Sequence, residues 1–395
     1  MKRSIICSLI TTLFFVAVVA MAMAQDAEKA LHNTEKVLPD TEKVLSNTEK
    51  VLPNTEKVLL DTEKVLLDTD MVEIFDDGIA MMMLQFDPKI ELLGVTTVVG
   101  NSWVADGTAF ALRQLEAIKA THIPVAMGIT RPLRPGRHET MPLERQLFGI
   151  GNDTWAGSFS YPEPESWEAY YRKAYGLAPT VQPIEQHAVD FIIEQVKKYP
   201  GQVTIAAIGT CTNIALAILK APEIVPLVKR IVYMGGSFFS QGNSTPTSEF
   251  NWWADPEAAK IALRSPWKEQ IIVGLDVCEK ITFKKHEYKK VCSIVKNPVI
   301  TEMLNRNELG TLYDQNENYF QYIWDVIVAA IIMEPTLITE EVTLPVDICT
   351  DYGHAYGQSM AYKEQAPIGC QNARIILAVD EERLWKLIYD YCAKF

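Results

Sequence analysis

The sequence predicts an α/β fold in which a mostly parallel central sheet is covered by helices on both faces, within a single domain. Three observations support this class. Short runs rich in Val, Ile and Leu alternate with segments of helical spacing over most of the chain. The runs are apolar throughout, as expected of strands buried between two layers of helices. With 48% hydrophobic and 22% charged residues in 395, the chain has enough apolar surface for a large core.

The predicted elements follow that alternation. Strands are expected at 64–67, 90–99, 123–127, 203–208, 231–234 and 271–275, and helices at 106–120, 184–199, 213–219, 256–263 and 326–333. Mobile loops, on which base specificity would depend, are expected at 130–182 and 300–324. Because parallel strands end at one edge of a sheet, ligands are expected at the loops that follow these strands.

The first 24 residues have the pattern of a secretory signal peptide. Lys2 and Arg3 precede an apolar stretch at 5–20, and the small residues of the triplet 22–24 fit a signal-peptidase site. The mature chain would be exported to the periplasm or the extracellular space, with no membrane association after cleavage. An uncleaved membrane anchor is the alternative interpretation.

Five tandem heptads built on Thr-Glu-Lys-Val-Leu occupy residues 33–67. A coiled coil is excluded because Val and Leu are adjacent in each copy, and because Pro39 and Pro53 would interrupt a helix. Residues 25–62 are therefore expected to form a mostly disordered tether. The last copy is expected to supply the first strand of a domain at 63–395.

The net charge of the chain limits the kind of partner that it can bind. A formal charge of −13 argues against nucleic acid as a partner, because phosphate binding needs a basic face. Small molecules or cations are expected as partners instead.

Six cysteines lie beyond the signal peptide: Cys211, Cys278, Cys292, Cys349, Cys370 and Cys392. Their wide spacing, with no Cys-x-x-Cys pair, predicts free thiols rather than structural disulfides.

An acidic segment follows the first predicted strand. It carries five carboxylates, those of Asp68, Asp70, Glu73, Asp76 and Asp77. Magnesium and calcium prefer carboxylate and carbonyl oxygens, and a loop after a parallel strand can supply several of them. The segment therefore indicates a cation site, with a solvated acidic turn as the alternative.

Glycine and polar residues recur where the later strands end. The groups are Gly100-Asn101, Gly209-Thr210-Cys211-Thr212-Asn213, Gly235-Gly236, Gly242-Asn243, Glu249-Phe250-Asn251 and Asp255-Pro256-Glu257. Glycine lets the backbone approach a ligand closely, and the polar neighbours can hydrogen-bond hydroxyl groups. Turn chemistry explains any one group, but a binding edge explains their recurrence better.

In order and spacing, these segments resemble the signature of the inosine-uridine preferring nucleoside hydrolases over roughly residues 62–395. The resemblance rests on Asp68-Thr69-Asp70 with Asp76-Asp77, Val95-Thr96-Thr97-Val98-Val99-Gly100-Asn101, Thr212-Asn213-Ile214-Ala215, Met234-Gly235-Gly236, Gly242-Asn243, Glu249-Phe250-Asn251 and Asp255-Pro256-Glu257-Ala258-Ala259. It implies a Rossmann-like nucleoside hydrolase domain. It also implies calcium-dependent hydrolysis of the N-glycosidic bond of ribonucleosides to free base and ribose, for nucleoside salvage, by a dimer or tetramer.

The resemblance assigns roles to ten residues. Asp70, Asp77, Asp325 and the backbone carbonyl of Ile208 would hold Ca²⁺. Asp70, Asn101 and Asn251 would be catalytic, with Asp70 taking a proton from the attacking water. Substrate contacts would come from Asp76, Asn101, Asn243, Glu249, Asn251 and Trp324. For Asp325 alone, an ordinary helix N-cap is the alternative interpretation.

These residue types suit the reaction on physical grounds as well. Carboxylate and amide oxygens around the sugar stabilise the positive charge that develops in an oxocarbenium-like transition state. A calcium ion that chelates the sugar diol also implies that a substrate lacking the 2′-hydroxyl binds and reacts poorly.

The acidic loop departs from the family pattern. Asp76 and Asp77 follow Asp70 by six and seven residues rather than four and five, and Val72 to Ile74 stand where longer-loop relatives have Gly, Asn and Asp. Because a β-branched residue does not easily adopt a positive φ, the loop is expected to follow a different path or to weaken the site. Gly78, in place of a small alanine, is expected to loosen the following helix by about 1 kcal/mol.

Trp324 stands where a histidine often precedes the late aspartate and helps to protonate the leaving base. The leaving-group acid is therefore unassigned, because His138 and His354 lie in predicted loops and a lone loop histidine is usually solvated surface. Trp324 could stack on a base instead, together with Trp252, Trp253 or the tyrosines at 319–322.

Other chemistries find little support in the sequence. It contains no GxSxG, HExxH, GxxxxGK[ST] or GxGxxG motif. The alternative function is an exported, calcium-holding nucleoside or sugar binding protein with weak or no hydrolytic activity. The residues do not choose between purine and pyrimidine nucleosides.

Overall fold

The computed structural model describes residues 62–148, 155–306 and 308–395, and Thr62–Phe395 form one compact unit. The predicted signal peptide, and the predicted tether up to residue 61, lie outside the described residues. None of the described helices is long and apolar enough to span a bilayer.

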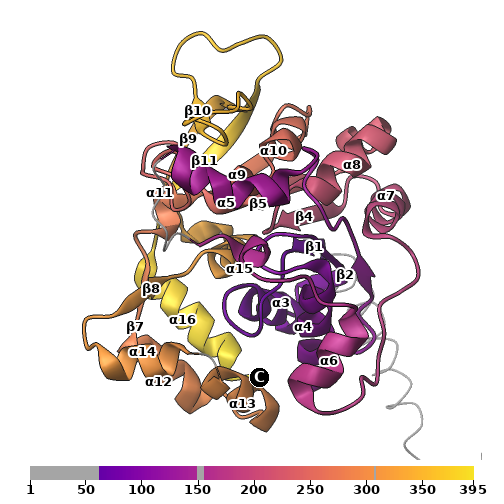
Figure 1. The fold of residues 1–395 in the computed structure, drawn as a ribbon, viewed down its shortest axis with the longest axis vertical. Helices are drawn as coiled ribbons and strands as arrows, with labels where there is room; N and C mark the ends of the chain where they lie inside the picture. Colours follow the sequence, from indigo (N-terminus) through magenta and orange to yellow (C-terminus); the bar gives the residue numbers. More distant parts are fainter. Residues whose placement is uncertain (1–61, 149–154, 307) are drawn as a thin grey trace, which may run out of the picture. The chain divides into compact units, whose positions relative to one another are not determined.

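A nine-stranded sheet forms the centre of the unit, in the order β10-β9-β11-β6-β5-β4-β1-β2-β3 (Figure 1). Its strands are β1 (Glu63–Thr69), β2 (Ile90–Thr97), β3 (Val125–Met127), β4 (Val203–Ala207), β5 (Arg230–Met234), β6 (Gln270–Val273), β9 (Ile338–Ile348), β10 (Ser359–Ala361) and β11 (Gln371–Val379). All neighbouring strands from β11 to β3 are parallel, whereas β9 and β10 are antiparallel to their neighbours. The predicted parallel sheet is confirmed, with three further strands at its end.

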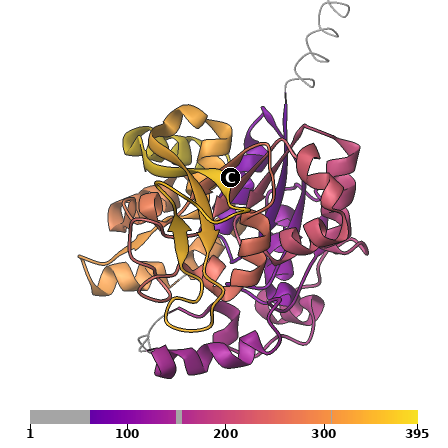
Figure 2. The same cartoon turned by 90° about the horizontal axis from the view of Figure 1, so that it is seen from above.

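Helices cover both faces of the sheet, as predicted (Figures 1 and 2). One face packs against α3 (Asp77–Phe86), α4 (Val104–Ala117), α15 (Asp325–Met333) and α16 (Glu381–Cys392). The other packs against α7 (Ala188–Lys198), α8 (Thr212–Lys220) and α10 (Pro256–Leu263). Successive β1 side chains alternate between the two cores, Val65 and Leu67 on one face and Leu66 on the other, and all three are fully buried.

The two segments predicted as loops contain regular structure instead. The first holds α5 (Arg137–Phe148), the short 3₁₀ helix η1 (Gly157–Ser160) and α6 (Trp167–Tyr175). Helix α6 has local signals that explain it, because Ser166 caps its first turn and Gly176 ends it at φ 67°. The second contains the end of α13 (Pro298–Arg306), α14 (Leu309–Gln315) and β8 (Phe320–Tyr322).

A small antiparallel ribbon lies beside the main sheet and matters for the site. It pairs β7 (Thr282–Lys284) with β8, placing Thr282 opposite Tyr322. The remaining elements are η2 (Pro222–Leu227), α9 (Phe250–Ala254), α11 (Leu275–Cys278), α12 (Lys285–Ile294) and η3 (Pro335–Leu337).

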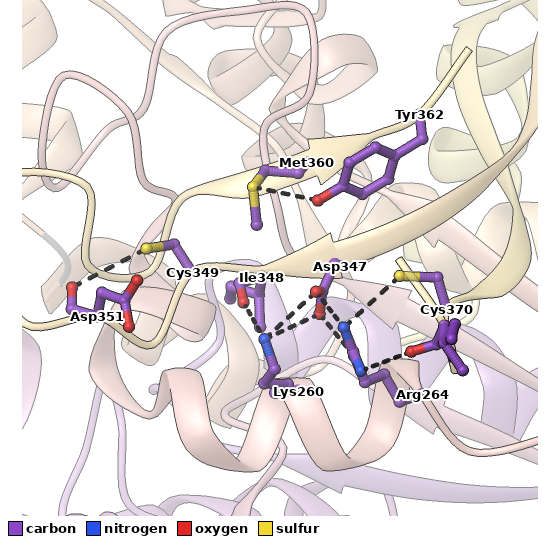
Figure 3. A network of polar contacts seen from close by, with 10 residues as sticks. Lys260, Arg264, Asp347, Ile348, Cys349, Asp351, Met360, Tyr362 and Cys370 are labelled. Carbon is purple, nitrogen blue, oxygen red and sulfur yellow. Dashed lines mark hydrogen bonds and ion pairs between the residues drawn. The ribbon is translucent and has the colours of Figure 1, made fainter. Parts of the chain in front are cut away.

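The antiparallel end of the sheet is tied to α10 by charge (Figure 3). Arg264 donates two hydrogen bonds to the carboxylate of Asp347 in β9, at 3.0 and 2.6 Å. Lys260 reaches the same carboxylate at 3.2 Å and donates to the carbonyl of Ile348 at 2.9 Å. Although burial raises the pKa of Asp347, its bonds to Arg264 and Lys260 outweigh burial and lower it overall. The carboxylate is therefore held ionised in a structural role.

The six cysteines of the described chain are free, which confirms the prediction of unpaired thiols. Cys211, Cys278 and Cys392 are buried, and the other three are half-buried. In Figure 3, the Cys370 sulfur accepts a weak hydrogen bond from Arg264 at 3.7 Å, and the Cys349 thiol lies 3.9 Å from the carbonyl oxygen of Asp351.

Candidate active site

A cavity of about 590 Å³ opens at the edge where the parallel strands end, a volume suited to a small-molecule ligand. Eight of the ten predicted site residues line it: Asp76, Asp77, Asn101, Asn243, Glu249, Asn251, Trp324 and Asp325. The other two lie directly behind its wall. Asp70 Oδ2 accepts a hydrogen bond from the backbone N–H of Asn101 at 2.6 Å, and the Ile208 carbonyl accepts one from the side-chain amide of Asn251 at 3.0 Å.

Asp77 and Asp325 line the cavity and Asp70 lies behind its wall, and these three buried aspartates make up its acidic floor. Each keeps one buried oxygen that has no hydrogen-bond partner among the described residues: Asp70 Oδ1, Asp77 Oδ2 and Asp325 Oδ1. The side-chain oxygen of Asn251 is unpartnered in the same way. A buried polar oxygen without a partner is costly, so three such carboxylate oxygens and one amide oxygen in one place indicate a site for a cation or a hydroxyl-rich ligand.

The electrostatics of this floor point to a cation. Burial, and then the charge of Asp77, raise the pKa of Asp70 well above its usual range. Burial also raises the pKa of Asp325, and the neighbouring carboxylates of Asp76, Asp77 and Asp70 raise it further. Burial raises the pKa of Asp77 to about 7 despite a hydrogen bond from Thr69. A divalent cation among these groups would remove the repulsion and favour the ionised carboxylates.

The carboxylates alone do not complete a metal site. Within residues 62–148, 155–306 and 308–395, no group of three or more His, Cys, Asp or Glu side chains is arranged to hold a metal ion by itself. Calcium takes six to eight oxygen ligands, including backbone and amide carbonyls. The carbonyl of Ile208 and the amide oxygen of Asn251 are the further protein oxygens available here. The donor set therefore fits calcium if a ligand in the cavity supplies the remaining oxygens.

Asp76 connects the acidic loop to α15. Its carboxylate accepts hydrogen bonds from the backbone N–H groups of Trp324, at 3.1 Å, and Val326, at 3.2 Å. The carboxylate thus caps the N-terminus of α15 from a distant part of the chain. Asp325 itself is the first residue of the helix and is not its N-cap, so the N-cap alternative for Asp325 is wrong.

The lengthened acidic loop adopts a strained backbone with positive φ angles, which the sequence analysis did not expect for a β-branched residue. Ile74 has φ 56° and Asp76 has φ 57°, in the region that L residues rarely adopt. Gln114 of α4 supports this path, because its Oε1 accepts from the Ile74 N–H at 2.9 Å and its Nε2 donates to the Val72 carbonyl at 3.3 Å. The loop therefore keeps Ile74 at positive φ, held from outside by one buried amide.

Gly78 has a packing role that the sequence did not reveal. A Cβ added at this glycine would lie 1.9 Å from Oε1 of Gln114. The expected loosening of α3 is therefore not the main consequence of a glycine here. Its missing side chain leaves the space that Gln114 needs to hold the acidic loop.

Glu249 and Asn243 hold α9 against the cavity. Glu249 accepts from the N–H of Asn251 at 2.7 Å and from the N–H groups of Gly236 and Trp252 at 3.0 and 3.1 Å. Asn243 Oδ1 accepts from the N–H of Phe250 at 2.9 Å. Burial raises the pKa of Glu249 to about 7, although these backbone donors oppose it. Both side chains line the cavity while they fix the position of Asn251.

Aromatic side chains also line the cavity. Trp324 and Tyr322 both line it, with ring centroids 6.2 Å apart in an edge-to-face arrangement. Trp252 and Trp253 are 0% and 1% exposed and pack in the core, so the expectation that they stack on a base is wrong. His138 and His354 are absent from the described cavity lining.

Several lining residues were missed by the sequence argument: Trp155, Ser244, Glu279, Leu309 and Gln321. Trp155 donates to the side-chain oxygen of Asn101 at 2.6 Å. Glu279 follows α11, the short helix that comes directly after β6, so its place in a segment after a parallel strand was a usable signal. Leu309 and Gln321 come from the segment predicted as loop, and no local pattern places them at the cavity.

Comparisons with known proteins agree with this architecture. The family model for inosine-uridine preferring nucleoside hydrolases matches residues 65–386. The inosine-uridine preferring nucleoside hydrolase of Leishmania major is 30% identical over 317 residues, covering 80% of this chain and 93% of that protein. The pyrimidine-specific ribonucleoside hydrolase of Escherichia coli is 28% identical over 320 residues, covering 79% and 92%.

Solved structures support the fold. A plant nucleoside hydrolase superposes with a TM-score of 0.69 at 24% identity, covering 84% of this chain and 99% of that one. A purine-preferring ribonucleoside hydrolase from Gardnerella vaginalis superposes with a TM-score of 0.67 at 24% identity, covering 84% and 98%. With the match over residues 65–386, the chain belongs to the inosine-uridine preferring nucleoside hydrolase family, a family of N-glycosyl hydrolases.

Proposed function

We propose that this protein is an exported, calcium-dependent hydrolase that splits ribonucleosides into free base and ribose. The observation that carries the proposal is the buried floor of Asp70, Asp77 and Asp325, each with an unpaired oxygen, beneath a cavity of nucleoside size. Family membership supports hydrolysis of the N-glycosidic bond. The sequence of residues 1–24 supports export.

Asp70, Asp77, Asp325 and the Ile208 carbonyl would hold the calcium ion. When bound, the ion supplies positive charge that holds the ribose diol and makes a water molecule more acidic. Asp70 suits the role of proton acceptor, because its Oδ1 is buried and unpaired whereas its Oδ2 is fixed by the N–H of Asn101.

The remaining residues orient the sugar and exclude water. Asp76 uses its carboxylate to cap α15 and has lone pairs left to accept a ribose hydroxyl. The amide oxygen of Asn251 is unpaired in the structure, and it can stabilise positive charge that develops on the ribosyl ring. Trp324 and Tyr322 line the same cavity and present aromatic surface for the base.

A nucleoside panel tests this function. Uridine, cytidine, inosine, adenosine and guanosine are incubated with calcium or with excess chelator, and release of free base and ribose is measured. We expect turnover of at least one ribonucleoside with calcium, and a loss of about 100-fold or more with chelator. The matching 2′-deoxynucleoside should react poorly because it lacks one hydroxyl of the diol.

The same panel distinguishes hydrolysis from the alternative function, which is binding without cleavage. A nucleoside or sugar binding protein would bind a member of the panel with calcium present, as measured by calorimetry, but would release no base from any of them. That outcome would replace hydrolysis with binding as the function.

We also propose that the enzyme serves nucleoside salvage and that it is a dimer or tetramer. The molecular mass of the protein in solution tests the number of subunits.

A further inference from the structure

Trp155 lines the cavity while much of its ring stays in solvent. The residue is 56% exposed, although tryptophan is highly buried on average. Its one polar atom, Nε1, donates a hydrogen bond to Oδ1 of Asn101, another lining residue, at 2.6 Å. A tryptophan kept for folding would bury its ring. The exposure of Trp155 together with this contact therefore indicates a role at the cavity.

The segment that carries Trp155 is fixed on the turn at Gly100. The backbone N–H and the hydroxyl of Ser158 both donate to the Gly100 carbonyl, at 2.9 and 2.8 Å. Gly157 has φ 53°, and a Cβ added there would lie 2.4 Å from the Gly100 oxygen and 3.0 Å from Cα of Asn101. Glycine at this position therefore permits the close approach that brings the indole N–H to Asn101.

The indole N–H determines which end of the Asn101 amide is left for the site. An indole nitrogen can only donate, so it binds the amide oxygen and leaves the amide nitrogen for other partners. Asp70 is such a partner. Burial and then the charge of Asp77 raise the pKa of Asp70, whereas hydrogen bonds from the backbone and the side chain of Asn101 lower it. The Asn101 side chain can donate to a carboxylate only through its amide nitrogen.

The backbone of Asn101 is held independently of Trp155. Its N–H donates to Oδ2 of Asp70 at 2.6 Å. Loss of the indole N–H would therefore leave the residue in place but would free its side-chain amide, whose χ2 torsion is broad and roughly two-fold. A turned amide would present its oxygen to the Asp70 carboxylate, and two acceptors cannot form a hydrogen bond.

We propose that Trp155 is a positioning residue for the hydrolysis, which holds the side-chain amide of Asn101 with its nitrogen toward Asp70 and the cavity. The inference rests on the proposed nucleoside function and adds a residue to its machinery. Asn101 acts on the substrate, and Trp155 acts only through Asn101. This role differs from stacking on a base, which would not depend on Asn101.

A double-mutant cycle tests whether Trp155 acts through Asn101. Trp155→Phe keeps an aromatic ring and removes the indole N–H. It should lower kcat/KM for the best ribonucleoside by about 5- to 10-fold, the effect of one net hydrogen bond. In an Asn101→Ala background the same change should cost less than about 2-fold. Equal fold-changes in the two backgrounds would overturn the proposal, because a ring that stacks on the substrate or supports the fold acts without Asn101.

Trp267→Phe is the matched control. The indole N–H of Trp267 donates to the Ala262 carbonyl at 2.8 Å, and the residue is absent from the described cavity lining. This variant loses the same kind of hydrogen bond and should keep the wild-type kcat/KM. An equal fall of kcat/KM in both tryptophan variants would count against a specific role for Trp155.

NMR of protein with ¹⁵N-labelled indole groups measures the contact without a substrate. The Nε1–H resonance that disappears in Trp155→Phe identifies Trp155. In Asn101→Ala this resonance should shift and its proton should exchange faster with water, whereas the resonance of Trp267 should not change. A Trp155 resonance that is the same in the wild type and in Asn101→Ala would also overturn the inference.

The two proposals can fail separately. If the wild type binds nucleosides without cleaving them, hydrolysis fails, and the same cycle measured on binding constants decides the role of Trp155. If no nucleoside binds, the proposed function and the positioning role both fail.

Discussion

At the residue scale, Asp77 joins two functions in one carboxylate. One of its oxygens accepts from the Thr69 hydroxyl, and the other is buried and unpaired beneath the cavity. The first fixes the side chain relative to β1, and the second is free for a cation. A change that keeps the shape but removes the charge therefore tests the floor of the site without altering the packing.

Asp77→Asn should lose calcium binding and lower kcat/KM by about 100-fold or more, because an amide replaces one of the charged ligands. Calorimetric titration with calcium and release of base from the best substrate measure the two effects. Asp351→Asn, an exposed aspartate outside the cavity lining, should change neither. Full turnover in Asp77→Asn would contradict the assigned site.

The effects of substitutions at Gly78 and Gln114 on the free energy of unfolding should depend on each other. In the wild type, Gly78→Ala forces its Cβ against Oε1 of Gln114 and breaks the bond that holds Ile74, with an expected loss of about 1 to 3 kcal/mol of unfolding free energy. In a Gln114→Ala background the space is free, so the same change should stabilise by up to about 1 kcal/mol through helix propensity.

Urea unfolding of the four proteins in this cycle measures the coupling. A change of sign between the two backgrounds is the expected result. Equal effects of Gly78→Ala in both would show that Gln114 does not occupy that space in solution. Turnover should also fall in Gln114→Ala, because the acidic loop loses its support.

At the scale of elements, the strand β1 is anchored at its start by charge. Glu63 accepts from Arg230 Nε at 3.1 Å and lies 3.2 Å from the ammonium of Lys229. Although burial raises the pKa of Glu63, its interactions with Arg230, Thr204 and Lys229 outweigh burial and leave it lowered overall. A lowered folded-state pKa means that this group stabilises the fold above its unfolded pKa and loses that contribution as pH falls.

Glu63→Gln should therefore lower the unfolding free energy at pH 7 by about 1 to 2 kcal/mol, a value reduced for the partial exposure of the pair. The difference from the wild type should shrink as pH falls through about 4.5 and below, where the wild-type carboxylate is protonated. Urea midpoints between pH 3.5 and 7 measure it. A difference that stays constant over this range would contradict the ionic anchor.

At the scale of the whole molecule, the repeat before β1 creates a competing register. Residues 55–62 have the same eight-residue sequence as 62–69, Thr-Glu-Lys-Val-Leu-Leu-Asp-Thr. The earlier copy carries the same side chains that β1 buries between β2 and β4. A chain paired through it would place Glu63 where Asp70 belongs and would lack the acidic loop at the site.

Deletion of residues 33–61 should therefore raise the fraction of refolded chains that are active, while leaving kcat/KM per active site and the thermal midpoint unchanged. Active-site titration after refolding, together with thermal unfolding, measures both. A fall in the midpoint would mean that the repeats contribute to the folded domain, against their predicted role as a tether.

The sequence was sufficient for strands β1 to β6 and for helices α4, α7, α8, α10 and α15, because those segments are apolar with clear periodicity and ordered turn signals. It did not predict β9, β10 and β11. Through the family resemblance it also indicated all ten site residues that the cavity and its wall bring together. Eight of them lie in segments after parallel strands, which converge at one edge of the sheet, whereas Trp324 and Asp325 stand at the start of α15. The prediction failed at 130–182, where helix α6 was hidden among Pro, Gly and aromatic residues.

By itself, the sequence determined the family, the fold class and the acidic edge, since these follow from local pattern and from order along the chain. Only the tertiary structure decided that Asp76 caps α15 and that Gln114 holds Ile74 at positive φ. It also decided that the indole of Trp155 donates to the side chain of Asn101. These features depend on contacts between residues far apart in the chain, and local pattern carries no information about which distant partner satisfies a polar group.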